Sequence, residues 1–327
     1  MLQNKQGAVI DMNNLTCASF FAGVGGIDIG FEQQGFKVIY ANEIDSLACA
    51  TYEKNFNIKV DNRDINNVKS SEIPNFDIML AGFPCQAFSL AGNRQGFEDE
   101  KGRGVLFFEL KRIFKNKKPK VIFLENVKNL VGHDKGNTFR KILETLENEG
   151  YYVKYQVLNA MEYGDIPQNR ERIYIVAFKN KSKYQKFEFP KPIKLNNTLS
   201  DFIDYNTKIN DKYYYDENCK FYSELKSNMK LKDTVYQWRR IYVRENKSKV
   251  CPTLTANMGT GGHNVPLILT DNGIRKLTPK ECFNLQGFQE NYTLPKELAN
   301  THLYKQAGNS VVIPVVARIA ENIKKVL

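Results

Sequence analysis

The residue best placed to act as a nucleophile in this sequence is Cys85. An apolar run at residues 76–81 precedes it, and Gly82 and Pro84 form a turn between that run and the cysteine. Cys85 would therefore stand just beyond the end of a buried strand, where α/β proteins present reactive side chains. A buried structural cysteine is the competing interpretation, because most free cysteines pack as small hydrophobic residues.

Acidic side chains stand at the ends of other predicted strands. Glu43 and Glu125 each follow an apolar run, and Asp64 follows a shorter one. In an α/β protein the carboxyl ends of parallel strands meet at one edge of the sheet, and ligands bind there. We therefore expect these three carboxylates to lie around one site.

Two arginines lead into another apolar run, at residues 173–178. In an extended segment Arg170 and Arg172 would share one face, with Glu171 on the other. Arginines entering a buried strand need partners, and a phosphate, a carboxylate or a base carbonyl would suit them. An internal ion pair with Glu171 or another acid is the alternative.

A glycine-rich turn at residues 22–26 follows the first predicted strand. It lets a ligand approach the backbone, but Asp28 stands where a dinucleotide-binding pattern would continue with glycine. Glu43, about 20 residues further on, suits a ribose diol, and Asp64 could accept from an adenine amino group. An adenosine without a diphosphate is what S-adenosyl-L-methionine offers, with S-adenosyl-L-homocysteine as the product.

Strand and helix signals alternate through the first half of the chain, which predicts an α/β fold with a doubly wound, mostly parallel sheet. The expected strands are residues 16–21, 36–41, 58–60, 76–81, 120–124 and 151–158, followed by 173–178. The expected helices are residues 27–34, 47–55, 105–116 and 138–148.

Composition is ordinary for a soluble globular protein of 327 residues, with 42% apolar and 25% charged residues. We find neither a signal-peptide core at the start nor an apolar run long enough to cross a membrane. The six cysteines are scattered without a Cys-x-x-Cys pair, which argues against a zinc site or a disulfide framework. We expect a cytoplasmic monomer with no metal and no membrane contact.

The formal charge of +11 suits a polyanionic partner. Residues 179–250 hold 17 Lys and Arg against 9 Asp and Glu, together with eight tyrosines and Trp238. Basic residues interleaved with aromatic ones are typical of a nucleic-acid surface. A solvated lysine-rich face is the alternative interpretation of this composition.

Five motifs in order resemble those of the DNA (cytosine-5)-methyltransferases, most closely the enzymes of bacterial restriction–modification systems. They are residues 21–26 (FAGVGG), 82–86 (GFPCQ), 125–127 (ENV), 168–172 (QNRER) and 306–312 (QAGNSVV). The resemblance covers essentially the whole chain. It is interrupted mainly at about residues 179–253, where that family varies its target-recognition region.

The resemblance implies a covalent mechanism in duplex DNA. Cys85 would add to C6 of cytosine, making C5 nucleophilic, while Glu125 holds N3 and the exocyclic amine. Arg172 would contact the base O2, and Arg170 is counted with the catalytic residues. Methyl transfer to C5 is followed by loss of the C5 proton and release of Cys85. A base inside a duplex is out of reach, so the cytosine must be flipped out.

The resemblance also assigns binding residues. Expected cofactor contacts are Phe21, Gly23, Gly25, Gly26, Glu43, Ile44, Asp64, Ile65, Pro84, Leu106, Asn309 and Ser310. Expected DNA contacts are Gln86, Ser89, Arg239, Arg240, Arg244, Thr253, Gly261 and Gly262. A restriction endonuclease would be the functional partner.

Two domains are expected. Residues 1–185 and 305–327 would form a discontinuous catalytic and cofactor-binding domain, and residues 186–304 a target-recognition domain with its hinge. Residues 87–104 resemble a lid over the flipped base, residues 237–246 form one strand-like stretch, and residues 253–263 a recognition loop.

Two helices are expected near the end of the chain. Residues 279–285 read as a capped helix. Residues 308–310 would start a C-terminal helix that folds back onto the first domain and lines the cofactor pocket, with Pro314 in its first turn.

Two alternatives stay open. A tRNA cytosine-5 methyltransferase of the same fold would share all five motifs. A DNA-binding regulator could have kept the fold and lost catalysis, although Cys85, Glu125 and Arg172 are all in place. The target sequence does not follow from the residues.

Overall fold

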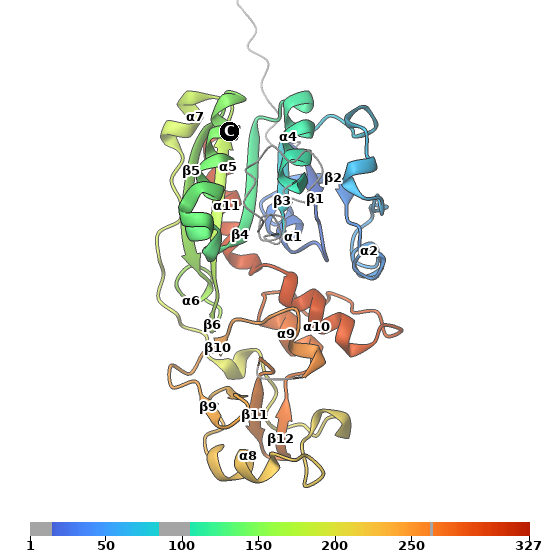
Figure 1. The fold of residues 1–327 in the computed structure, drawn as a ribbon, viewed down its shortest axis with the longest axis vertical. Coiled ribbons are helices and arrows are strands. Elements are labelled where there is room, and N and C mark those ends of the chain that lie inside the picture. Colours follow the sequence, from blue (N-terminus) through green and yellow to red (C-terminus); the bar gives the residue numbers. More distant parts are fainter. Residues whose placement is uncertain (1–14, 85–104, 262–263) are drawn as a thin grey trace, which may run out of the picture.

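Two lobes share the chain, a larger one built on a six-stranded sheet and a smaller one built on a four-stranded sheet (Figure 1). The computed structural model describes residues 15–84, 105–261 and 264–327. In the larger sheet the strands follow the order β2–β1–β3–β4–β7–β5. Their bounds are β1 Thr16–Phe20, β2 Lys37–Asn42, β3 Ile78–Gly82, β4 Val121–Val127, β5 Tyr152–Asn159 and β7 Glu171–Phe178.

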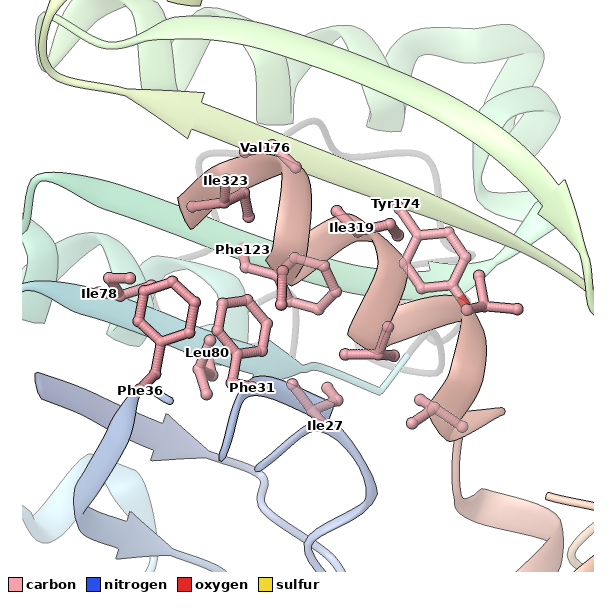
Figure 2. Close-up of a cluster of buried hydrophobic side chains, with 14 of the residues drawn as sticks. Ile27, Phe31, Phe36, Ile78, Leu80, Phe123, Tyr174, Val176, Ile319 and Ile323 are labelled. Carbon is pink, nitrogen blue, oxygen red and sulfur yellow. The ribbon is translucent and has the colours of Figure 1, made fainter. Parts of the chain in front are cut away.

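The central strands are continuous apolar runs because helices cover both faces of the sheet. Helices α1 (Gly26–Glu32) and α11 (Ile313–Val326) pack on one face, and α4 (Val105–Lys117) and α5 (Asn137–Asn148) contribute to the core on the other. Figure 2 shows the core on the face of the sheet that α1 and α11 cover. Ile319 and Ile323 of α11 belong there to the same buried cluster as Phe31 and Phe123. The predicted α/β fold is confirmed. Residues of α11 form part of the core that lies on the same face of the sheet as α1.

Strand β7 runs antiparallel to both of its neighbours, β4 and β5. Strands β1 to β4 pair in parallel, so the sheet is mostly, not entirely, parallel. The order of strand and helix signals cannot reveal this, because a buried strand has the same apolar pattern whichever direction it runs in the sheet.

The strand expected at residues 58–60 does not form. One β-bridge joins Asn42 to Asp61 there. The side-chain amide of Asn42 instead donates to the carbonyls of Asp61 (2.8 Å) and Arg63 (2.9 Å), so a side chain fixes this segment where a ladder was expected. The next helix, α2, spans Ser46–Glu53.

The smaller lobe contains the antiparallel sheet β12–β11–β8–β9. Its strands are β8 Tyr236–Trp238, β9 Val243–Glu245, β11 Leu267–Thr270 and β12 Gly273–Lys276. The stretch at 237–246, expected to be one strand, is a hairpin. Arg240 has a positive φ of 72° at its tip, and the Arg239 N–H donates to the Tyr242 carbonyl at 2.8 Å, which closes the turn.

Further short helices and strands complete the two lobes and the region between them. They are α6 Ala160–Tyr163, β6 Gln168–Asn169, α7 Lys181–Lys186, α8 Tyr222–Asn228, β10 Cys251–Pro252, α9 Pro279–Asn284 and α10 Asn300–Asn309. Strands β6 and β10 pair in parallel. The 3₁₀ segments are Ile65–Asn67, Ser70–Glu72, Lys128–Gly136, Leu199–Asp201, Asp211–Tyr213 and Met258–Thr260.

The capped helix expected at 279–285 is confirmed as α9, where Thr278 and Glu281 form a reciprocal capping box. The expected start of a helix at residues 308–310 is wrong. These residues close α10 instead, because the Ser310 N–H still donates to the carbonyls of Gln306 and Ala307. Helix α11 begins three residues later, with Pro314 in its first turn as expected.

Residues 187–197 pack against the larger lobe. Phe187 and Phe189 belong to the core beneath β7, and the N–H groups of Asn196 and Asn197 donate to the side chain of Asp165. Leu199 instead belongs to a cluster that it shares mainly with residues after it in the chain, such as Val235 and Leu277. We therefore propose a boundary near residue 198, later than the residue 186 suggested by the Pro-rich stretch.

Candidate active site

Strands β4 and β7 bring the predicted acid and arginine together. Their register aligns Val127 with Arg172, and Nε of Arg172 lies 3.1 Å from Oε1 of Glu125. Both side chains are largely buried. Burial raises the pKa of Glu125, and the positive charges of Arg172 and Arg170 oppose this only in part. The site therefore holds a carboxyl group that keeps its proton more readily than an exposed one.

The chain that leads to Cys85 ends at the same edge of the sheet. Gly82, the last residue of β3, is aligned with Glu125 of β4, and a Cβ built on Gly82 would lie 3.5 Å from Oε2 of Glu125. Phe83 and Pro84 continue from there. The acid thus lies beside the turn whose next residue is Cys85.

Asn126 is a site residue that the sequence reasoning missed. Its Nδ2 donates to the carbonyl of Phe83 at 2.7 Å, and its Oδ1 accepts from the backbone N–H of Val127 at 2.8 Å. The side chain therefore ties the turn after β3 to the end of β4. The signal available in the sequence was a polar residue just after an apolar run, because a polar side chain that becomes buried there needs hydrogen-bond partners.

Arg170 makes its contacts away from any open surface. Its side chain is buried, and its terminal nitrogens donate to the carbonyls of Leu254 (2.7 Å), Gly308 (2.9 Å) and Ser310 (2.5 Å). Three backbone carbonyls from two distant segments thus occupy the donors that a substrate would need. This geometry favours a positioning role for Arg170 over contact with the base.

The glycine-rich turn and Glu43 form a second part of the site. The Gly23 N–H donates to Oε2 of Glu43 at 2.9 Å, and the Asp45 N–H donates to Oε1 at 2.8 Å. Gly23 has a positive φ of 57°, and a Cβ built on it would meet nothing within 4 Å. The turn therefore faces open space, and each oxygen of Glu43 keeps a lone pair for a hydroxyl.

Ile44 lies next to this carboxylate and is 61% exposed, which is unusual for a large aliphatic residue. Such a surface suits the flat face of a base. The segment that leads to Asp64 and Ile65 contacts Ile44, because Nδ2 of Asn62 donates to the Ile44 carbonyl at 3.0 Å. Asp64 caps a 3₁₀ turn there and accepts from the Asn66 N–H at 2.9 Å. Ile65 is buried in the same cluster against which Leu106 packs. These features fit an adenosine better than a diphosphate.

The end of α10 reaches the glycine-rich turn from the other end of the chain. A Cβ built on Gly26 would lie 2.5 Å from Oγ of Ser310, so these residues touch only because position 26 is glycine. The hydroxyl of Ser310 is buried without a hydrogen-bond partner among the described residues. Phe21 has a positive φ of 54° at the start of the turn, and Asn309 is exposed. The motifs at 21–26 and 309–310 therefore form one site.

Comparison with known proteins agrees with this geometry. Residues 15–325 match the family C-5 cytosine-specific DNA methylase. The chain belongs to this family. It is 63% identical over 313 residues to the Type II methyltransferase M.Bsp6I of Bacillus sp. (strain RFL6), covering 95% of this chain and 99% of that protein. It is 39% identical to the Type II methyltransferase M.HhaI of Haemophilus parahaemolyticus, covering 95% of each chain.

Solved structures confirm the fold. The methyltransferase EhMeth of Entamoeba histolytica superposes with a TM-score of 0.75 at 20% identity, covering 95% of this chain and 98% of that one. The Dnmt2 methyltransferase of S. pombe superposes with a TM-score of 0.73 at 17% identity, covering 95% and 98%. These two likenesses show the fold alone. The family match and the Type II relatives show that the chain is an enzyme that methylates cytosine at C5 in DNA in a sequence-specific manner.

The methyltransferase exposes its predicted DNA-reading arginines on the β8–β9 hairpin. Arg240 and Arg244 are exposed and Arg239 is half-buried. Ile241 and Tyr242, at the tip, are 86% and 54% exposed. The sequence reasoning did not single out this apolar tip, because only the hairpin turn shows that these residues face solvent.

The loop expected to recognise the target sequence follows β10. Thr253 Oγ1 donates to the carbonyl of Asn169 at 2.6 Å, which ties the start of the loop to the strand leading to Arg172. Gly261 is exposed with a positive φ of 85°. Cys85, Gln86, Ser89, Gly262 and the expected lid at 87–104 lie outside the described residues, so their roles stay predictions.

Neither a metal site nor a membrane span is found in the part of the chain that the structure describes. No group of three or more His, Cys, Asp or Glu side chains there could hold a metal ion. No helix within the described ranges is both long and apolar enough to cross a bilayer.

Proposed function

We propose that this methyltransferase uses S-adenosyl-L-methionine and attacks a flipped-out cytosine through a Cys85–C6 adduct. The observation that carries the proposal is the position of the Glu125–Arg172 pair beside the turn that leads to Cys85. An acid of raised pKa next to a cysteine is what covalent activation of a pyrimidine needs.

The proposed reaction divides between three side chains. The Cys85 thiolate adds to C6, and the electron pair moves to C5. Glu125, held by Arg172, hydrogen-bonds N3 and the exocyclic amine and limits the charge that builds up on the ring. Arg172 also contacts the base O2. After C5 is methylated, its proton leaves and the C6–Sγ bond breaks, which restores the aromatic ring and the thiolate.

S-adenosyl-L-methionine would supply the electrophilic methyl group, and the residues around the glycine-rich turn fit it. Glu43 would accept hydrogen bonds from the ribose hydroxyls. The backbone N–H groups of Gly23 and Asp45 fix the carboxylate in place, and each of its oxygens keeps a lone pair for a hydroxyl. Ile44 would pack against the adenine, with Asp64 and Ile65 at its polar edge. Phe21, Gly25, Gly26, Pro84, Leu106, Asn309 and Ser310 would complete the pocket.

The DNA would lie between the lobes, with the recognition hairpin and loop against its bases. Exposed Arg240 and Arg244 are suited to guanine edges in the major groove, and the lysines of residues 179–250 to phosphates. Because the similar relatives are named Type II methyltransferases, we propose that this enzyme works with a restriction endonuclease of the same specificity. We expect it to act as a monomer.

The adduct can be tested with DNA that contains 5-fluorocytosine, whose C5 fluorine cannot leave. Bisulfite sequencing of DNA from a host expressing the gene first identifies the methylated sequence. We expect a denaturation-resistant protein–DNA adduct on that sequence with S-adenosyl-L-methionine, and none with Cys85→Ser. Methyl transfer by Cys85→Ser at a tenth of the wild-type rate would contradict the covalent mechanism.

A further inference from the structure

The turn of the β8–β9 hairpin carries the most exposed of the large apolar side chains among the described residues. Ile241 is 86% exposed, and its neighbour Tyr242 is 54% exposed. An isoleucine side chain gains free energy when it leaves water, and the protein by itself leaves this gain unused. The hairpin therefore presents apolar surface that a ligand can bury.

The backbone of the turn is a second, independent observation. The Arg239 N–H donates to the Tyr242 carbonyl at 2.8 Å, which continues the register of the two strands. Residues 240 and 241 therefore form a two-residue turn. Arg240 has a positive φ of 72°, at a position where such turns favour glycine or asparagine. Two large side chains thus stand where small ones are less costly, which indicates that the side chains themselves are used.

One face of the hairpin is fixed by packing, because successive residues of a strand point to opposite faces. Trp238 and Val243 pack against the apolar cluster of the smaller sheet, and Trp238 stacks on Phe221 with 4.9 Å between ring centroids. Tyr242 and Arg244 precede and follow Val243, so they lie on the opposite face, and both are exposed. The packed face holds the turn in place, and the other face presents a guanidinium group close to the apolar tip.

Duplex DNA offers an apolar partner at the place where arginines read bases. A two-stranded β-ribbon fits the major groove, in which arginine donates to the O6 and N7 atoms of guanine. The methyl group on C5 of thymine lies in the same groove, and proteins read it by apolar contact. In 5-methylcytosine the same group stands at the same position. Ile241 lies between Arg240 and Arg244 in the chain, so a C5 methyl group is the partner that suits it.

We propose that Ile241 determines specificity by packing against the C5 methyl group of a pyrimidine in the major groove of the target duplex. Thymine carries this group, and so does the 5-methylcytosine that the enzyme itself produces, when it stands in the strand opposite the target cytosine. The inference rests on the proposed placement of the hairpin against the bases. It gives the hairpin two kinds of reader, guanidinium groups for guanine and an apolar side chain for a methylated pyrimidine.

The test compares three duplexes built on the target sequence that bisulfite sequencing identifies. The first carries the natural bases, the second has uracil in place of every thymine, and the third has 5-methylcytosine in place of every cytosine in the strand opposite the target. Equilibrium titrations at one salt concentration give the affinity of the wild type and of Ile241→Ala for each duplex.

The two base changes distinguish the two sources of the methyl group. One buried methyl group corresponds to about a fourfold change in affinity. If Ile241 reads thymine, the wild type should lose about fourfold with uracil. If it reads a methylated cytosine, the wild type should gain about fourfold with 5-methylcytosine. Ile241→Ala should lack the response that the wild type shows, and folding is not at issue because the side chain is exposed.

Ile193→Ala is the matched control, because Ile193 is also an exposed isoleucine but belongs to the segment that packs against the larger lobe. Its affinities for the three duplexes should equal those of the wild type. Ile241→Val keeps a branched apolar side chain and should retain most of the response to the methyl group.

Equal responses of the wild type and Ile241→Ala to both base changes would overturn the proposal, even if the variant binds all three duplexes more weakly. The affinities of Arg240→Ala and Arg244→Ala then show which inference has failed. If either arginine variant loses affinity for the target sequence, the hairpin contacts DNA and only the reading of the methyl group is wrong. If neither variant nor Ile241→Ala differs from the wild type, the proposed placement of the hairpin is wrong.

Discussion

Arg172 pairs with Glu125 across the antiparallel strands β7 and β4, at 3.1 Å between Nε and Oε1. The pair links the two motifs in which the sequence suggested catalytic side chains. A buried carboxyl group is costly to ionise, and the arginine compensates only in part, so the pKa of Glu125 stays raised. A carboxyl group that holds its proton in this way is what the proposed role of Glu125 at the base requires.

Glu125→Gln should lower the methyl-transfer rate by about 10²–10⁴-fold, the usual contribution of a positioned acid or base. The amide keeps the shape of the side chain but cannot exchange a proton with N3. Single-turnover transfer on the methylated sequence measures the rate, and DNA binding should stay within a few-fold of wild type. A rate above one tenth of wild type would rule out proton transfer by Glu125.

Glu43→Ala should weaken S-adenosyl-L-methionine binding by roughly 1.5–3 kcal/mol, the usual contribution of a charge-assisted hydrogen bond. Calorimetry gives the affinity directly. Glu144→Ala, which removes an exposed acid of α5, is the control for the change in net charge. If both variants bind as the wild type does, Glu43 has no part in holding the ribose.

Arg240 and Arg244 should separate sequence reading from DNA anchoring. Replacing the arginine that contacts a guanine edge should cost about 1–3 kcal/mol on the methylated sequence and little on random duplex. Replacing exposed Lys230 should weaken binding to both duplexes and flatten the salt dependence. Lys232 is a less clean choice, because it already pairs with Asp271.

Titrations of both duplexes at several salt concentrations distinguish the two roles. Equal losses on both duplexes for both arginine variants would make the hairpin an anchor and leave the reading of bases to the loop after β10.

Asp28 should make stability depend on pH. Burial raises the pKa of Asp28 from its usual 3.8 to about 6, although hydrogen bonds from Ser19 and Tyr52 oppose the shift. The folded protein therefore binds more protons than the unfolded chain between these values. Its contribution to stability is present at low pH and is lost as pH rises from about 4 to 6.

The difference in unfolding free energy between wild type and Asp28→Asn should change by roughly 2 kcal/mol over that window, because each pKa unit corresponds to about 1.4 kcal/mol and both titrations extend beyond the window. Urea unfolding at pH 4 and pH 7 measures it, with the wild type losing stability relative to the variant at the higher pH. A difference independent of pH would mean that Asp28 titrates alike in both states.

The sequence predicted the parts of the site that depend on local pattern. Glu43 and Glu125 were placed at strand ends because apolar runs precede them, and the capping box of α9 follows from Thr278 and Glu281. The contact between Arg172 and Glu125 was beyond reach, because it depends on the direction and register of β7. The exposed tip at Ile241 depends on the positive φ of Arg240, which a non-glycine residue rarely adopts.

Helix α11 has a consequence for the order in which the protein is made. It packs against α1 in the core of the larger lobe (Figure 2), yet it is synthesised long after α1, because most of the chain lies between the two helices. At about 5–20 residues per second, α1 waits on the order of tens of seconds for this partner. During that time the part of the sheet face that α11 covers is exposed, and the motif at 309–310 has not reached the glycine-rich turn. A nascent chain therefore cannot complete this site before residues 309–310 have been translated and α11 has packed, and until then the core residues that contact α11 form an exposed apolar surface to which chaperones can bind.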